Sequence, residues 1–141
     1  MIRRGEEKDL KTLAAMADRL WPGHEPGALE RELLELLRSP EAALFLADGA
    51  AGFAQCQLRH DYVEGTGHSP VGYLEGIWVR EDSRGKGIAR QLLRACEEWA
   101  KAQGCREFAS DCELTNIQSQ RFHERAGFRE ANRIVCFVKE L

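Results

Sequence analysis

Residues 83–104, SRGKGIARQLLRACEEWAKAQG, decide the fold because they join a glycine-rich loop to the most regular apolar repeat in the chain. The apolar side chains of this stretch recur at helical spacing, at Ala89, Leu92, Leu93, Cys96, Trp99 and Ala100. That spacing predicts a long amphipathic helix. Gly85 and Gly87 fall at its start, where unpaired backbone N–H groups and partial positive charge favour binding of a phosphate group.

Two common phosphate-binding loops do not fit this stretch. The chain has no G-x-x-x-x-G-K-[ST] sequence, and the loop lacks the third glycine of a dinucleotide-binding fingerprint. A glycine-containing turn that only leads into the helix is the alternative to phosphate binding. Arg84, Lys86 and Arg90 add positive charge around the glycines and favour the phosphate interpretation.

Outward from this helix, strand-like and helix-like segments alternate. Leucine and alanine repeats predict helices over 10–20, 29–37 and 116–126, the last one ending at Gly127. β-branched and aromatic runs predict strands over 1–4, 43–47, 52–58, 73–79, 108–112 and 134–138, with a tight hairpin at Asp48-Gly49. No linker or repeat interrupts the chain, so we expect a single α/β domain over residues 1–141 with a mixed sheet.

Composition excludes several classes of protein. The 141 residues carry a net charge of −3 without a basic stripe, which argues against nucleic-acid binding and is compatible with a cationic small molecule. No run approaches the roughly 18 apolar residues of a membrane span, and the charged start predicts a cytoplasmic protein. Five scattered cysteines and four histidines show no metal-ligand spacing, so no metal is expected.

Two blocks carry a family resemblance. Arg84, Gly87 and Ala89 match the R-x-x-G-x-A signature of the GNAT superfamily of acyl-CoA-dependent N-acyltransferases. Residues 116–128, NIQSQRFHERAGF, are similar to the N-x-x-[AS]-x-x-F-[YH]-x-x-x-G-F stretch of that superfamily. Further short segments narrow the resemblance to aminoglycoside 6′-N-acetyltransferases over nearly the whole chain; they are 20–24, 59–63, 74–77 and 109–111.

The resemblance implies a GNAT fold, a strongly bent, mostly antiparallel sheet in which the strand holding Glu75 is bulged and splays from the strand holding Asp111. The gap would admit the pantetheine arm of acetyl-CoA. Gly76 suits such a bulge. The implied cofactor contacts are Ile77, Trp78, Val79, Arg84, Gly85, Lys86, Gly87, Ile88, Ala89, Arg90 and Asn116. Asn116 also suits a simple helix N-cap.

The same resemblance implies substrate-binding and catalytic side chains. Glu75 and Asp111 would face the incoming amine, and His123 stands where the family often has a tyrosine that protonates the thiolate. A protonated amine cannot attack a thioester, so a base is needed, which could be Glu75, Asp111 or ordered water. A packed histidine is the alternative for His123. Further implied substrate contacts are Trp21, His24, Tyr62, Glu130 and Asn132, although Asn132 departs from an expected acidic residue.

The function that this resemblance implies is direct transfer of acetyl from acetyl-CoA to the 6′-amine of an aminoglycoside, by a homodimer. No G-x-S-x-G elbow suggests a covalent intermediate. Two alternatives stay open at this point. One is a GNAT enzyme for another amine, such as a polyamine or a peptide N-terminus, and the other is an acyl-CoA-binding sensor without catalysis.

Overall fold

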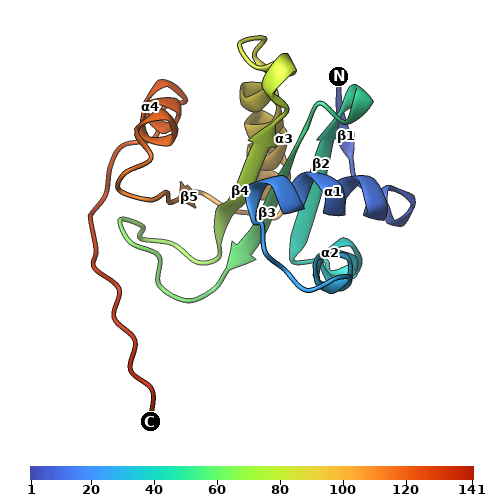
Figure 1. Ribbon diagram of the computed structural model, residues 1–141. Helices are drawn as coiled ribbons and strands as arrows, with labels where there is room; N and C mark the ends of the chain where they lie inside the picture. Colours follow the sequence, from blue (N-terminus) through green and yellow to red (C-terminus); the bar gives the residue numbers. More distant parts are fainter.

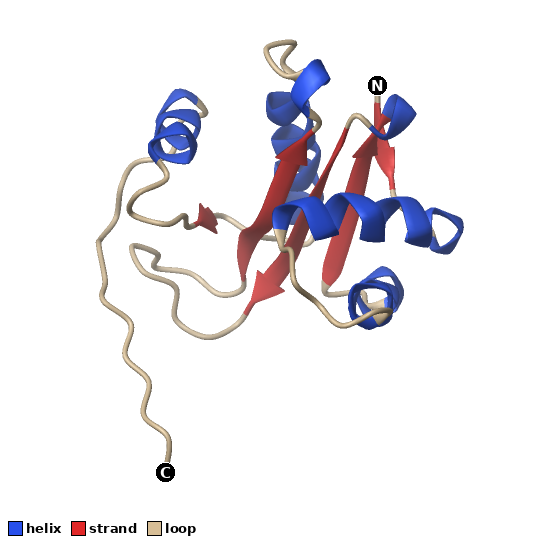
Figure 2. Cartoon of the chain, viewed as in Figure 1, coloured by secondary structure: helices blue, strands red, loops and turns tan.

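The computed structural model describes residues 1–141 and contains a single five-stranded sheet with helices on both faces (Figure 1, Figure 2). The strands lie side by side in chain order, as β1 Ile2–Arg4, β2 Ala42–Ala47, β3 Gly52–Arg59, β4 Val71–Val79 and β5 Phe108–Ser110. Pairing is antiparallel from β1 to β4 and parallel between β4 and β5. The predicted mixed sheet is therefore confirmed.

The four α-helices follow the apolar repeats of the sequence. They are α1 Leu10–Leu20, α2 Ala28–Arg38, α3 Ile88–Ala102 and α4 Ile117–Arg125, and each lies within two residues of the bounds expected from its apolar side chains. Short 3₁₀ turns occur at Glu7–Asp9, Asp48–Ala50 and Glu81–Ser83. The hairpin between β2 and β3 turns through the second of these, where Gly49 adopts a positive φ of 67°.

Alternation along β2 shows how the two faces are covered. Ala43 belongs to a cluster with Leu92, Leu93 and Cys96 of α3, whereas its neighbour Leu44 packs with residues of α1 and α2. Successive side chains of a strand point to opposite faces, so α3 covers one face and the α1–α2 pair the other. None of the helices is both long and apolar enough to cross a membrane.

A β-bulge in β4 changes this alternation at the place that matters for function. Gln55 pairs with Gly76 and Cys56 pairs with Leu74, so Glu75 is an extra residue without a partner on β3. Leu74 packs with α3 before the bulge, and Ile77 packs there after it. Trp78 consequently lies against the cluster on the α1 side. The bulge expected at Glu75 is confirmed.

The C-terminal prediction of a strand over 134–138 is wrong for the single chain. Residues 128–141 contain no helix or strand and run away from the sheet (Figure 1). The side chains of Phe137 and Val138 are 92% and 97% exposed. The sequence has the composition of a strand, but a strand needs a neighbouring strand for its backbone groups, and this chain offers none along the path of the segment.

Candidate active site

The site lies where β4 and β5 separate. Pairing between these strands covers Gly72 to Leu74 on β4 and stops at Ser110 on β5, one residue short of Asp111. The edge of β4 that faces β5 therefore has no strand partner from Glu75, the bulged residue, to Val79. The predicted strand over 108–112 is shortened to Phe108–Ser110 for the same reason. The chain segments therefore diverge with Glu75 on β4 and Asp111 directly after β5.

Both carboxylates already have protein partners. Arg59, the last residue of β3, donates to Glu75 twice, from Nε to Oε2 at 3.0 Å and from Nη2 to Oε1 at 2.7 Å. The hydroxyl of Tyr73 donates to Oδ2 of Asp111. The Arg59 guanidinium lies 3.5 Å from the centre of the Tyr73 ring, so the four side chains form one network from Asp111 to Glu75.

Electrostatics in this network follow from burial and charge. Tyr73 is only 7% exposed, and its burial, together with the hydrogen bond to Asp111, raises the pKa of its phenol well above the ordinary value. The phenol therefore keeps its proton and acts as a donor. The hydrogen bonds to Glu75 raise the pKa of Arg59, which stays charged.

His123 is held by polar contacts with residues of α4 and β5. Its Nδ1 lies 2.7 Å from the backbone carbonyl of Ser119, which can only accept, so Nδ1–H is the donor. Its Nε2 lies 2.8 Å from Oγ of Ser110. The ring also packs edge-on against Phe122 and Phe128. His123 thus has the packing of a structural histidine and, in Ser110, a hydroxyl partner that can pass a proton.

The glycine loop leads from the end of β4 into α3. Gly85 and Gly87 have positive φ values of 77° and 80°, and an added Cβ would meet nothing within 4 Å at either position. Their backbone is thus open to solvent beside the first turn of α3. Lys86 is exposed, whereas Arg84 donates through Nε to the carbonyl of Val79 and Arg90 donates to that of Arg125.

These features fit a coenzyme A pyrophosphate. An open backbone at a helix N-terminus with three nearby cations is suited to an anion, and the free edge of β4 can pair with an amide-containing arm. Asn116 lies at the start of α4, where its side-chain oxygen accepts from the Ser119 N–H at 3.1 Å. The N-cap alternative is therefore present in the structure, and a contact of Asn116 with pantetheine stays a prediction.

Two of the expected substrate contacts lie in the loop after α1. The indole of Trp21 covers Gly76, and a Cβ at Gly76 would come within 2.4 Å of the ring. Trp21 also packs edge-on against Phe53 with ring centres 6.2 Å apart. His24 is exposed, and its Nδ1 lies 2.8 Å from the Trp21 carbonyl. Trp21 therefore packs on the core beside the bulge, and its contact with a substrate stays a prediction.

The other expected contacts come from exposed segments. Tyr62, in the loop between β3 and β4, is 75% exposed. Glu130 pairs with Arg133 at 2.9 Å on the C-terminal segment. The Asn132 amide donates to Glu64 at 3.3 Å, which brings that segment against the same β3–β4 loop. The single chain therefore leaves these three residues open to solvent.

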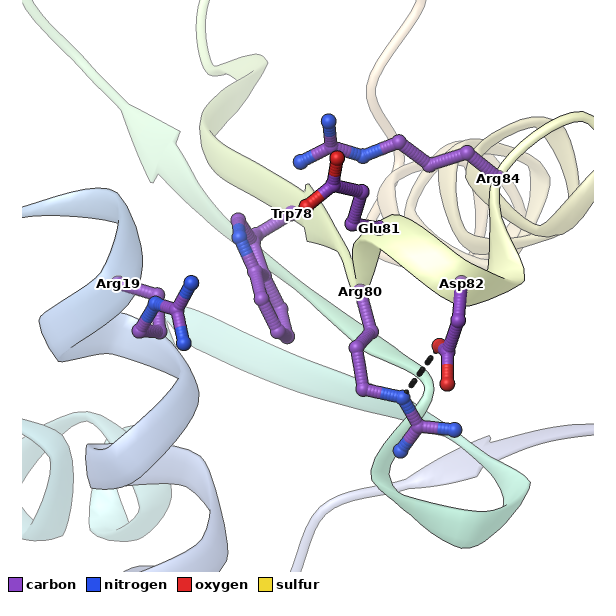
Figure 3. Close-up of a pocket in the computed structure, with 6 residues that line it drawn as sticks. All are labelled: Arg19, Trp78, Arg80, Glu81, Asp82 and Arg84. Atoms are coloured by element: carbon purple, nitrogen blue, oxygen red, sulfur yellow. Dashed lines mark hydrogen bonds and ion pairs between the residues drawn. The ribbon is translucent and has the colours of Figure 1, made fainter.

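A cavity of about 400 Å³ opens at the other end of β4 (Figure 3). It is lined by Arg19 of α1, by Trp78, and by Arg80, Glu81, Asp82 and Arg84 around the turn that precedes the glycine loop. Figure 3 shows the ion pair between Arg80 and Asp82, whose atoms are 2.6 Å apart. Neither Glu75 nor Asp111 borders this cavity, so the carboxylates and the cavity mark different parts of the molecule.

Sequence reasoning did not single out Arg59, Tyr73 or Ser110. Period-two alternation could have suggested Tyr73, which precedes Glu75 by two residues on the same strand. The pairing of Arg59 with Glu75 depends on the register between β3 and β4, which includes the bulge. No group of three or more histidine, cysteine, aspartate or glutamate side chains has the arrangement needed to hold a metal ion.

An unpaired strand edge, a glycine loop at a helix N-terminus and carboxylates beside them define an acetyl-CoA-dependent N-acetyltransferase. Comparison with known protein families agrees with this class. The model of the acetyltransferase (GNAT) family matches residues 10–128, and the chain belongs to that family.

Individual relatives extend over the whole chain. The chain is 41% identical to an aminoglycoside N(6′)-acetyltransferase type 1 of Serratia marcescens, covering 100% of this chain and 99% of that protein. Another, from Stenotrophomonas maltophilia, is 42% identical over 96% of this chain and 90% of that protein. The fold also matches AAC(6′)-Iy in complex with the bisubstrate analogue CoA-S-monomethyl-acetylneamine, with a TM-score of 0.95, 40% identity, and coverage of 100% and 98%.

Proposed function

We propose that this chain transfers the acetyl group of acetyl-CoA to the 6′-amine of aminoglycosides. The observation that carries the proposal is the pair of carboxylates, Glu75 and Asp111, on diverging strands beside the free edge of β4. Relatives with that activity, at about 40% identity over the full length, support the same substrate class. Acetylation removes a positive charge from the drug, which weakens its binding to phosphate-rich RNA and makes the cell resistant.

The amine is captured and prepared by the acidic network. Asp111 is exposed and has one oxygen free of the Tyr73 hydroxyl, so it is the first acceptor available to an ammonium group. Glu75 lies at the bulge, nearest to the free strand edge. The amine must lose a proton before it attacks, and Glu75, Asp111 or ordered water beside them takes it. Trp21, His24, Tyr62, Glu130 and Asn132 would contact the rest of the drug.

Acetyl-CoA, when bound, supplies the acetyl group as a thioester. The backbone of Ile77, Trp78 and Val79 would hold its pantetheine arm, and residues 84–90 its pyrophosphate. In its doubly protonated form His123 would give its Nε2 proton, through the Oγ of Ser110, to the departing thiolate and return to neutral imidazole, while Nδ1–H stays on the Ser119 carbonyl. The hydrogen-bonded pair of His123 and Ser110 would thus take the proton-donor role that a tyrosine often has in the family.

We also propose that the active form is a homodimer. Residues 134–138, IVCFV, have strand composition, are exposed and have no strand partner within the chain. The outer edge of β5 likewise lacks a neighbouring strand. Pairing of this C-terminal segment with a second copy would bury the apolar side chains and satisfy both sets of backbone groups. Such pairing also orders Glu130 and Asn132, which lie on the same segment.

Replacing Cys136 by proline tests this assembly, because proline removes a ladder donor from the middle of the segment. The wild type and the matched Cys136→Ser variant should sediment as dimers, and Cys136→Pro as a monomer. A monomeric wild type, or a dimeric proline variant, would contradict this mode of pairing. Residues 1–141 are proposed to act as one domain in the cytoplasm, without a nucleic-acid or membrane partner.

A thiol-release assay with acetyl-CoA tests the function. The panel contains aminoglycosides, polyamines and peptides with free N-termini, each at equal concentration. We expect turnover on aminoglycosides at kcat/KM values far above those on the other amines. Turnover confined to peptides or polyamines would move the enzyme to another GNAT substrate class, and tight acetyl-CoA binding without any turnover would indicate a sensor.

A further inference from the structure

We propose that Arg59 is a positioning residue that orients Glu75 and sets the net charge of the amine site. The inference deepens the proposed aminoglycoside acetylation and rests on it. Its basis is the two-pronged contact of 3.0 and 2.7 Å between the guanidinium and both oxygens of Glu75. A planar guanidinium that meets a carboxylate in this way fixes the orientation of the carboxylate as well as its distance.

The position of Arg59 is itself well determined. Its guanidinium lies 3.5 Å from the centre of the Tyr73 ring, within the range of a cation–π contact. The ring is buried and cannot move far, because Tyr73 packs with Val63 and Val71. The side chain of Glu75 is only 16% exposed, against 40% for Arg59. The pair therefore lies at the rim of the site, with the carboxylate on the inner side.

The network gives the two carboxylates unequal roles. Both oxygens of Glu75 are engaged by Arg59, whereas Asp111 accepts from Tyr73 at Oδ2 only. One cation and two anions leave a single net negative charge, and its free acceptor is on Asp111. Of the two carboxylates expected from sequence to face the amine, Asp111 has a free oxygen and Glu75 is held in place by Arg59.

This arrangement makes a specific prediction about charge and geometry. Without Arg59, two unneutralised carboxylates would attract a polycation more strongly, and the attraction would depend more steeply on salt. Glu75 would at the same time lose its fixed orientation beside the strand edge. Arg59 therefore weakens the attraction of the site for a cation but fixes the position of Glu75. Its loss should lower kcat without raising KM for the amine.

The experiment compares wild type, Arg59→Gln and Arg59→Lys by steady-state kinetics at two salt concentrations. Arg59→Gln removes the charge, and we expect kcat to fall about tenfold while KM for the amine stays level or falls, with a steeper salt dependence. Arg59→Lys keeps the charge but cannot hold both oxygens of Glu75. Its kcat should therefore fall, while the salt dependence of its KM should equal that of the wild type. Acetyl-CoA affinity by calorimetry should stay unchanged in both.

Two results would overturn the inference. One is wild-type kcat and KM in both variants. The other is a parallel loss of amine binding, acetyl-CoA binding and thermal stability, which would assign Arg59 a purely structural role. If Arg59→Gln does not fold, Arg59→Lys decides by its kcat alone. The comparison uses whichever cationic amine the wild type turns over best, so a wild type inactive on aminoglycosides refutes the proposed function without deciding the role of Arg59.

Discussion

Replacing Gly76 by alanine should destabilise the protein, although alanine ordinarily stabilises a strand relative to glycine. The new Cβ would lie 2.4 and 2.5 Å from Cζ2 and Cη2 of Trp21 and 3.0 Å from Cδ2 of Leu20. Carbon atoms in contact are normally about 3.5–4.0 Å apart, so the indole has to move by roughly 1 Å or more. Phe53, which is fully buried beneath the indole, prevents an inward shift.

The expected loss in the free energy of unfolding is that of an overpacked site, typically about 1–3 kcal/mol. For a chain of this length each kcal/mol lowers Tm by about 3–5 °C. Differential scanning calorimetry measures this, with Gly67→Ala as the matched control, because a Cβ at Gly67 meets nothing within 4 Å. The displaced Trp21 should also raise KM for the drug, since the ring lies beside the bulge that carries Glu75.

A double-mutant cycle isolates the cause. Combined with Trp21→Ala, the Gly76→Ala change should lose most of its destabilising effect, giving a coupling energy of about 1 kcal/mol or more. If Gly76→Ala melts with the wild type, or if its effect is the same with and without the indole, the close packing of Trp21 on β4 is not what requires glycine there.

Three further predictions concern the loop, the amine site and the fold. Gly87→Val should abolish most of the acetyl-CoA affinity measured by calorimetry. Gly104→Val, which has a similar positive φ and equally open surroundings at the other end of α3, should keep that affinity. Equal affinities of the two variants would contradict the assignment of the loop to the pyrophosphate. Asp111→Asn should raise KM for the drug about tenfold or more and leave acetyl-CoA binding unchanged. An unchanged KM in steady-state kinetics would contradict a role of Asp111 in binding the amine. Hydrogen bonds from Arg3 lower the pKa of Asp9 to about 2. Asp9→Asn should therefore lower the free energy of unfolding by about 1–2 kcal/mol at neutral pH. Urea titrations should show this difference from the wild type disappearing as the pH falls from about 4 to 2.

Local patterns predicted most of the fold. The apolar repeat of α3 and the stop signals after α1 and α2 placed those helices because periodicity and proline or glycine act within a few residues. The C-terminal strand failed because strand formation depends on a partner that no local pattern specifies. Residues 134–138 have the right composition, and the single chain supplies no edge for them.

The candidate site was predictable in part. Glu75 and Asp111 came from family resemblance and the glycine loop from its place at the start of a predicted helix, and the register of β4 and β5 brings the two carboxylates to corresponding positions. The contact of Arg59 with Glu75 was not predictable, because it depends on a bulge that shifts pairing by one residue. The role of Gly76 likewise became visible only through the position of Trp21.

The most direct test of the central claim uses two aminoglycosides that differ only in carrying an amine or a hydroxyl at the 6′ position. With acetyl-CoA and the purified protein, the 6′-amine compound should release coenzyme A and yield a product acetylated at that nitrogen, as located by NMR. The 6′-hydroxyl compound should give no turnover above background. Equal turnover of the two compounds, or acetylation at another amine, would contradict the assignment of this chain as a 6′-N-acetyltransferase.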